Sequence, residues 1–159
     1  MLKTTIDHLP ERKQAQLRAI TALISNAASI EMLILFGSYA RGDCVEDLAW
    51  DYFSDFDLLV VVNDLVLEKN ITLWSKLTDE ARRITGHVPV NLMTLHVQEV
   101  NDEIRRGHYF FVDIIAQGIL LYDSHRISLS KPKTIAPKKR LELGEWNFRY
   151  WFKSAGGFC

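Results

Sequence analysis

The chain has 159 residues, of which 48% are hydrophobic and 25% are charged, a balance typical of one globular domain. Its formal net charge of −1 excludes a general electrostatic attraction to nucleic acid or to an anionic membrane. No run of about 18 apolar residues occurs, so a membrane span is not expected.

The N-terminal segment is polar and lacks the apolar core of a signal peptide. The two cysteines, Cys44 and Cys159, lie far apart and do not have the spacing of a metal site. Together these features predict a protein of the reducing cytoplasm.

The first predicted elements are a helix and a strand. Pro10 suits the first turn of a helix, and apolar residues then recur at helical spacing, which predicts an amphipathic helix over residues 9–28. An apolar strand is predicted over 30–36. It ends at Gly37-Ser38, where a short helix is predicted to begin at Ser38.

Residues 43–53 are predicted to form a long loop that mixes acidic residues with Trp50, Tyr52 and Phe53. Two interpretations of these aromatic residues are open. They stack on a base or pack on a partner, or they belong to an ordinary solvated loop. The second interpretation is favoured.

The rest of the chain alternates strands and helices. A near-continuous apolar strand is predicted over 56–62, which indicates a sheet covered on both faces. Further elements are predicted over 71–84 (a helix capped by Gly86), 88–95 (a strand), 97–117 (helical, with a break near Gly107) and 119–122 (an edge strand). This alternation predicts the α/β class.

Two aspartates mark a candidate site at the start of the second apolar strand. Asp55 and Asp57 are two residues apart, which places both side chains on one face of a sheet. Carboxylates in such a pair repel each other unless a cation lies between them, and Mg²⁺ or Mn²⁺ suits oxygen ligands. Gly37 permits a close backbone approach, and a helix starting at Ser38 favours phosphate. The sequence therefore predicts phosphoryl or nucleotidyl transfer.

Arg41 follows the Gly37-Ser38 turn and has two interpretations. It holds a polyphosphate, or it pairs with a nearby carboxylate such as Asp43. The structural pairing is favoured, and Arg41 is retained with Gly37 and Ser38 as a candidate nucleotide-binding residue.

The segments GSYARG and SDFDLLV, in this order and each beside an apolar strand, resemble the signature of the polymerase β-type nucleotidyltransferases, especially their minimal stand-alone branch. The resemblance implies an α/β (α+β) fold with a central mixed sheet of about four or five strands and helices packed on it. It implies that the Gly-Ser turn contacts the triphosphate and that Asp55 and Asp57 hold magnesium. The implied reaction moves a nucleoside monophosphate, with AMP from ATP as the expected case, to an acceptor hydroxyl.

Asn91 departs from the pattern of this family. Members commonly carry a third carboxylate on the corresponding strand, and an amide can neither take a proton nor carry negative charge. Weaker base assistance costs about 10²–10⁴-fold in rate. Glu99 and Asp102 are not expected to substitute, and His96 is expected to be an ordinary satisfied histidine.

The C-terminal part differs in composition from the predicted nucleotidyltransferase domain at residues 1–123. Residues 124–137 are rich in Ser, Lys and Pro and predict an exposed linker, whose basic charge is interpreted as solvated rather than as a nucleic-acid site. Residues 138–159 are crowded with aromatic side chains and predict a helical tail that resembles the opening turn of the HEPN domain, to which minimal nucleotidyltransferases of bacteria are fused. A HEPN-domain partner, or self-association through this tail, is therefore expected.

Two hypotheses for function stay open. The first is an enzyme that transfers a nucleotide to an acceptor, with a partner toxin as one candidate acceptor. The second is an antitoxin-like module, catalytically weakened by Asn91, that masks a HEPN ribonuclease. An aminoglycoside nucleotidyltransferase is a weaker alternative, because a dedicated second domain for the acceptor is not visible.

Overall fold

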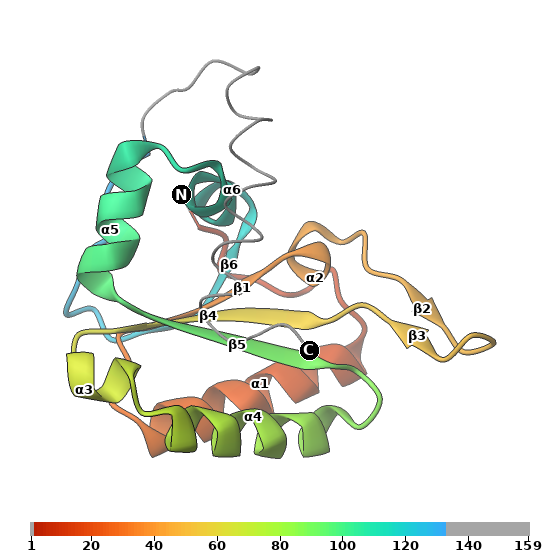
Figure 1. The fold of residues 1–159 in the computed structure, drawn as a ribbon. Helices are drawn as coiled ribbons and strands as arrows, with labels where there is room; N and C mark the ends of the chain where they lie inside the picture. Colours follow the sequence, from red (N-terminus) through yellow and green to blue (C-terminus); the bar gives the residue numbers. More distant parts are fainter. Residues whose placement is uncertain (1, 133–159) are drawn as a thin grey trace.

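A computed structural model describes residues 2–132 of the chain (Figure 1). Its elements, in chain order, are α1 (Glu11–Ala27), β1 (Met32–Phe36), α2 (Ser38–Arg41), β2 (Glu46–Asp47), β3 (Tyr52–Phe53), β4 (Phe56–Val62), α3 (Leu65–Glu68), α4 (Ile71–Thr85), β5 (Val90–His96), α5 (Val97–Arg106), α6 (Tyr109–Gln117) and β6 (Ile119–Asp123). The tail predicted at 138–159 lies outside the described residues. The domain boundary at residue 123 stays a prediction.

Four of the strands form one mixed sheet in the order β5-β4-β1-β6. β4 runs parallel to β5, whereas β1 is antiparallel to both β4 and β6. The end of β1 and the beginnings of β4 and β5 therefore meet at the same end of the sheet. This architecture confirms the predicted central mixed sheet of about four or five strands with helices packed on it.

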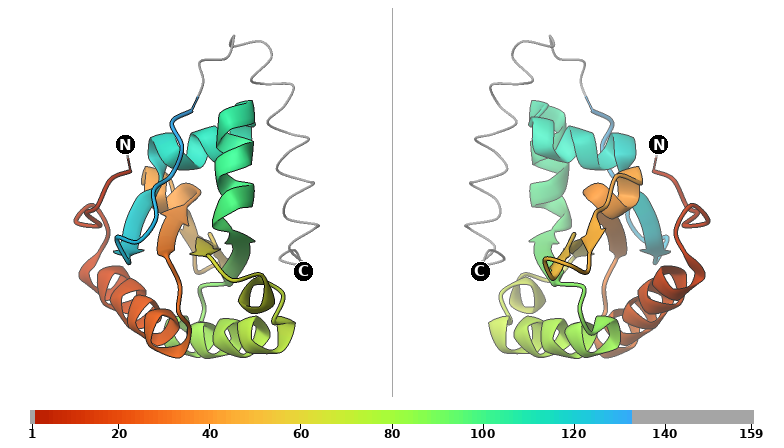
Figure 2. Two further views of the ribbon diagram at one scale, coloured as in Figure 1. Left: turned by 90° about the vertical axis from the view of Figure 1, so that its left-hand side faces the viewer. Right: turned by 90° about the vertical axis from the view of Figure 1, so that its right-hand side faces the viewer.

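Helices cover both faces of the sheet, as Figures 1 and 2 show. Side chains of a strand alternate between faces, so one apolar run supplies two cores. Leu58, Val60 and Val62 of β4 join the cluster with residues of α1 and α4, whereas Leu59 and Val61 join the cluster with residues of α5 and α6. All five are fully buried, which is why the sequence of β4 shows no polar alternation.

Short polar contacts fix the ends of the helices. Asn70 accepts a hydrogen bond from the backbone N–H of Leu73 and caps α4, and Asp64 caps α3, a short helix that the sequence did not predict. Gly107 has a φ of 74°, in the left-handed region, and separates α5 from α6. The predicted break near Gly107 is thus confirmed.

The loop predicted over residues 43–53 instead contains the small antiparallel hairpin β2–β3. Asp47 pairs with Tyr52 in it, and the side chain of Asp47 accepts hydrogen bonds from the N–H groups of Ala49 and Trp50, which closes the turn. The hairpin extends beyond the end of the sheet (Figure 1). The sequence missed it because each strand has only two residues and the turn uses a side-chain acceptor.

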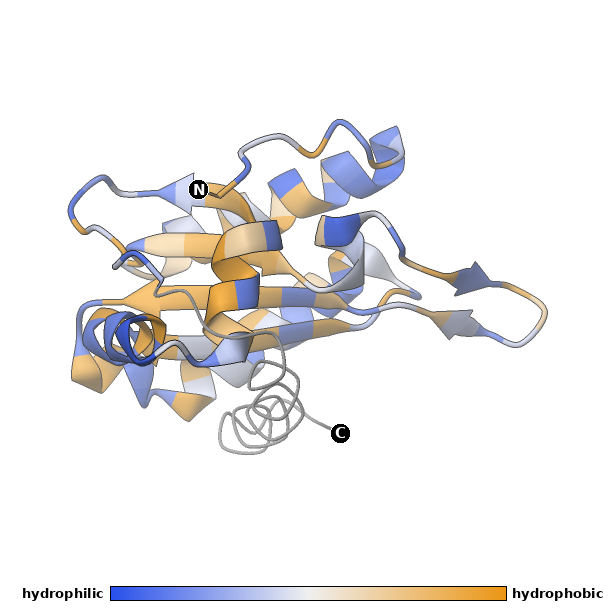
Figure 3. Cartoon of the chain, turned by 90° about the horizontal axis from the view of Figure 1, so that it is seen from above, coloured by the Kyte–Doolittle hydropathy of each residue, from blue (hydrophilic) through white to orange (hydrophobic). Residues whose placement is uncertain are grey.

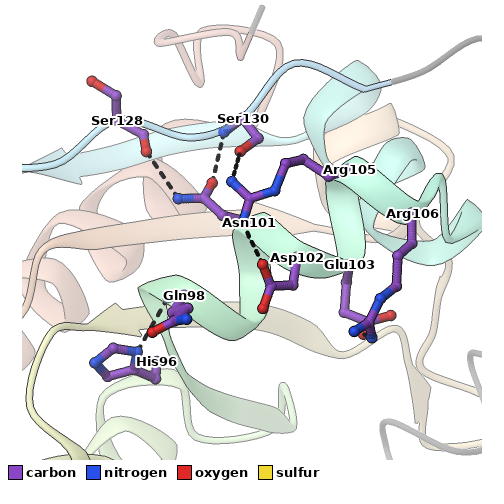
Figure 4. Close-up of polar contacts among 9 residues, drawn as sticks. All are labelled: His96, Gln98, Asn101, Asp102, Glu103, Arg105, Arg106, Ser128 and Ser130. Carbon is purple, nitrogen blue, oxygen red and sulfur yellow. Dashed lines mark hydrogen bonds and ion pairs between the residues drawn. The ribbon is translucent and has the colours of Figure 1, made fainter.

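The segment after β6 is attached to the body of the domain. Arg126 Nε lies 3.0 Å from the carboxylate of the buried Glu31. Asn101 of α5 donates to the carbonyl of Ser128 and accepts from the N–H of Ser130 (Figure 4). Among residues 2–132, no helix has the length and apolar character needed to cross a membrane.

Candidate functional site

Gly37 forms the sharp turn between β1 and α2. Its φ of 75° and ψ of −154° strain any residue with a side chain. A Cβ built at Gly37 would lie 2.6 Å from Oδ2 of Asp57, closer than any stable contact. Glycine is therefore required here for two reasons, the backbone conformation and the carboxylate that lies directly against the turn.

Asp55 and Asp57 lie on the same side of the sheet, as their spacing predicts. The evidence is a shared donor: Asn91 Nδ2 lies 2.9 Å from Asp55 Oδ2 and 3.1 Å from Asp57 Oδ1. Asn91 is the register partner of Asp57 across the parallel pair β4–β5. The sheet thus places Asn91 where a third carboxylate would face the other two.

Burial dominates the electrostatics of Asp57. It raises the pKa of Asp57 to about 6 from an ordinary value of 3.8. The hydrogen bond from Asn91 opposes this rise in pKa, the charge of Asp55 adds to it, and the charge of Arg41 opposes it. Within residues 2–132, neither Asp55 nor Asp57 forms an ion pair with a lysine, arginine or histidine.

A cleft of about 300 Å³ opens beside the Gly37 turn. One wall is formed by Gly37, Ser38 and Asp57, and the facing wall comes from α6, with Asp113 and Gln117 among its lining residues. Asp57 therefore lines the cleft together with the turn. Asp55 is not among the lining residues and is connected to Asp57 through Asn91.

The position of Arg41 is compatible with both interpretations, pairing with Asp43 and binding a polyphosphate. Its Nε lies 3.2 Å from Oδ2 of Asp43, the structural pair that the sequence favoured. The side chain also lines the cleft and is 41% exposed, so its guanidinium is accessible to an anion there. A role of Arg41 in nucleotide binding stays a prediction.

The donors at the two aspartates suit a hard cation. Two half-buried carboxylates without a cationic partner among the described residues repel each other, and a divalent ion with a preference for oxygen relieves this repulsion. No group of three or more His, Cys, Asp or Glu side chains in residues 2–132 is arranged to hold a metal. The protein thus offers two carboxylates, a number that suits Mg²⁺ when phosphates and water complete the shell.

Residues considered as substitutes for the third carboxylate lie elsewhere. Glu99 and Asp102 are on α5, which follows the far end of β5. Asp102 pairs with Arg105, and the His96 ring accepts the N–H of Gln98 at 3.1 Å (Figure 4). These residues are therefore excluded from the site, and the expectation of a satisfied His96 is confirmed.

The wall formed by α6 was missed by sequence reasoning. Phe110 and Ile114 of α6 pack against the sheet. Both also line the cleft, together with Tyr109, Asp113 and Gln117. The sequence did contain an indication of this wall: Asp113 and Gln117 are polar residues four positions apart on an otherwise apolar helix, so they lie on one face of it.

A scan against known families matches residues 18–127 to the family described as polymerase beta, nucleotidyltransferase. The chain belongs to this family. The match runs from the middle of α1 to just beyond β6, so the turn, both aspartates and Asn91 all lie within the nucleotidyltransferase region.

Two solved structures are similar to this nucleotidyltransferase at low identity. A crystal structure of a toxin–antitoxin with AMP-PNP is 13% identical, with 89% of this chain and 90% of that chain covered and a TM-score of 0.44. A presumed nucleotidyltransferase from Sulfolobus solfataricus is 20% identical, with 73% and 87% covered and a TM-score of 0.42. No curated protein matches the sequence.

Proposed function

We propose that this protein transfers a nucleoside monophosphate from a nucleoside triphosphate, with ATP as the expected donor, to an acceptor hydroxyl. One observation supports this proposal above the others: Asp57 lies directly against the Gly37 turn, and Asn91 joins it to Asp55. A triphosphate seated along Gly37 and Ser38 would lie beside the carboxylates, where charge develops during the transfer.

Each residue has a distinct role in this reaction. Gly37 allows the backbone to approach the triphosphate, and Ser38 offers its hydroxyl and the first N–H groups of α2. Asp55 and Asp57 would hold Mg²⁺ or Mn²⁺. When bound, this ion neutralises phosphate charge and supplies Lewis acidity. The acceptor oxygen attacks the α-phosphorus, and the bond to the pyrophosphate leaving group breaks.

Asn91 has a positioning role in this proposal. Its amide holds both carboxylates within reach of each other without adding negative charge. It cannot accept the proton of the acceptor hydroxyl, so this proton must leave to water or to the leaving group. Slow transfer is the expected consequence.

The same amide favours a second candidate function. A nucleotidyltransferase fold without its third carboxylate could act as a binding module that masks a HEPN ribonuclease, with residues 138–159 as the contacting segment. In this candidate the site binds nucleotide with little turnover. The two candidate functions therefore share one fold and differ in the rate of nucleotide transfer.

Titration calorimetry of the full chain with ATP tests the site. We expect ATP binding that requires Mg²⁺ and is lost in the double variant Asp55→Ala, Asp57→Ala. The matched control is Asp79→Ala, which removes an exposed carboxylate of α4 that pairs only with Arg82 among the described contacts. Unchanged ATP binding in the double variant would remove the metal role from these residues.

Transfer of label from ATP labelled at the α-phosphate separates the two candidates. Label on a purified HEPN-domain partner supports the enzyme, provided that the Asp55, Asp57 double variant transfers none. Tight complex formation without label supports the masking module. Label on neither, together with no complex, contradicts both partner proposals while leaving nucleotide binding intact.

A further inference from the structure

The large apolar side chains that are most exposed fall into two groups among residues 2–132. One group lies on α3 and the start of α4. The other lies on the β2–β3 hairpin, which Figure 3 shows extending away from the sheet with apolar residues near its turn. We call residues 45–54 the arm. Its exposed apolar residues are Val45, Leu48, Trp50 and Tyr52.

The base of the arm is fixed to the domain. The carboxylate of Glu46 in β2 forms an ion pair with Lys13 Nζ at 2.8 Å and accepts a hydrogen bond from the hydroxyl of Tyr39 at 3.1 Å. Phe53 of β3 packs on the core and stacks on the ring of His87 with centroids 5.8 Å apart. The arm therefore leaves the domain in a defined direction, which an unanchored loop would not do.

The tip of the arm presents apolar side chains to solvent. Leu48 and Trp50 are each 83% exposed. They gain little from the fold in this position, because most of each residue stays in contact with water. Exposed, clustered aromatic and aliphatic residues on a fixed support are typical of a surface that another molecule covers.

The negative charge of the arm and its flanking residues indicates what kind of molecule would bind there. Residues 43–55 contain five acidic side chains and no Lys, Arg or His. Asp43 and Glu46 are paired with Arg41 and Lys13, whereas Asp51 is exposed beside Trp50. Uncompensated negative charge repels the phosphates of nucleic acid and of anionic lipid, and it attracts cationic groups.

The position of the arm connects it to the site. β3 leads through Ser54 directly to Asp55, and the arm projects from the same end of the sheet as Gly37 and Asp57 (Figure 1). The backbone N–H of Ser54 donates to the carbonyl of Val45 at 2.8 Å, and its Oγ accepts the N–H of Val45 at 2.8 Å. A molecule bound to the arm thus approaches the domain from the end of the sheet that carries Asp55 and Asp57.

We propose that the arm is a docking surface for a polypeptide whose contacting face carries both cationic and apolar side chains. Leu48 and Trp50 make the apolar contact, and Asp51 faces the cations. Docking by itself does not require catalysis. That the docked polypeptide carries the acceptor hydroxyl rests on the proposed function.

The probe is a fluorescently labelled synthetic peptide of alternating Leu and Lys with one central Tyr. Its counterpart has Glu at every Lys position, and a single-stranded oligonucleotide of similar length represents nucleic acid. Anisotropy is measured with the full chain at about 150 mM salt, where long-range attraction is screened. The arm variant is Leu48→Ser with Trp50→Ser. The control is Leu65→Ser with Val66→Ser, which removes comparable exposed apolar residues from α3.

We expect the Lys peptide to bind at least tenfold more tightly than the Glu peptide and the oligonucleotide. The arm variant should weaken Lys-peptide binding at least tenfold, and the α3 control by less than twofold. Asp51→Asn, which keeps a residue tolerant of the φ of 50° at this position, should reduce the salt dependence of binding.

Equal affinity for the Lys and Glu peptides, or unchanged affinity in the arm variant, would overturn the proposal. Tighter binding of the oligonucleotide would assign the arm to nucleic acid, and a dimer in light scattering that the arm variant abolishes would assign it to a second copy. Either result also overturns the proposal. Calorimetry separates the docking proposal from the proposed function. The arm variant should still bind ATP with Mg²⁺, and the Asp55, Asp57 double variant should still bind the Lys peptide.

Discussion

At one end of the sheet Asp55 and Asp57 lie beside Asn91, and at the other end Glu68 of α3 lies beside Glu99 of α5. Both pairs bring carboxyl groups together. In the second pair, Glu68 accepts the backbone N–H of His96 at 3.0 Å, and the pKa of Glu99 is raised by burial and then by Glu68.

The difference between the pairs lies in what surrounds them. Glu68 joins α3 to the end of β5, and the raised pKa of Glu99 favours the neutral form of the Glu99 side chain. Asp57 instead faces a cleft and a glycine turn, and its neighbour Asn91 donates to it. Proximity of carboxylates is therefore a weak indication of a metal site, and the cleft and the turn are the stronger ones.

The largest expected effect comes from removing the carboxylate of Asp57, which lines the cleft. Asp57→Ala should lower nucleotide transfer by about 10³-fold or more, because metal assistance contributes several kcal/mol. Glu99→Gln, which can still hydrogen-bond Glu68, should change the rate by less than about twofold. Steady-state rates with labelled ATP measure both. Equal losses in the two variants would contradict the contrast between the pairs.

A third carboxylate should sharpen the same contrast. Asn91→Asp supplies a group that can accept a proton at the register partner of Asp57. The transfer rate with Mg²⁺ should rise by about 10²-fold, near the low end of the range for base catalysis. Asn91→Ala is the matched control and should not raise the rate. A decrease in Asn91→Asp would indicate that the amide itself is needed.

The raised pKa of Asp57 predicts a pH-dependent penalty in the metal-free protein. A folded-state pKa of about 6 against 3.8 means that ionising Asp57 opposes folding. Asp57→Asn should therefore increase the free energy of unfolding by about 2–3 kcal/mol at pH 8. This gain should fall between pH 6 and pH 4 and be absent below the unfolded pKa. Urea denaturation in chelator at three pH values measures it, and a gain independent of pH would contradict the assignment.

Two glycines with positive φ provide the smallest and cleanest comparison. Gly37→Ala introduces both backbone strain and a Cβ against Asp57, whereas Gly86→Ala, with φ of 67°, introduces strain into open space. The strain costs each variant about 1–2 kcal/mol of stability. Only Gly37→Ala should also weaken binding of ATP with Mg²⁺. Calorimetry and denaturation on both variants separate the two effects.

Much of the fold was predictable because its signals are local. Glycines at 37, 86 and 107 marked the ends of elements, and the unbroken apolar run at 56–62 indicated a sheet covered on both faces. The position of Asn91 was implied by the resemblance to the nucleotidyltransferases, and the structure produces it by pairing β5 with β4 in parallel. The spacing of Asp55 and Asp57 was sufficient to place them on one side.

The hairpin and the α6 wall of the cleft depend on tertiary contacts, which the spacing of residues in the sequence does not reveal. The hairpin rests on Asp47 capping a turn and on Lys13, 33 positions earlier in the sequence than Glu46, forming a pair with it. The wall of the cleft on α6 rests on how that helix crosses the sheet. Neither periodicity nor propensity fixes such tertiary arrangements, so Trp50 was interpreted as a solvated loop residue and Asp113 was not considered.

β4 is paired with β5 along its whole length and with β1 from Asp57 to Val61. Its amide protons can exchange with solvent only when a large part of the domain opens. The amide protons at the tip of the arm can exchange after a single hydrogen bond to Asp47 breaks. Deuterium uptake should therefore be slowest around residue 58 and fast around residue 49. Asp57 thus lies on the strand whose amides exchange most slowly, and the surface beside it can change its sequence, or even its length, at little risk to the carboxylates.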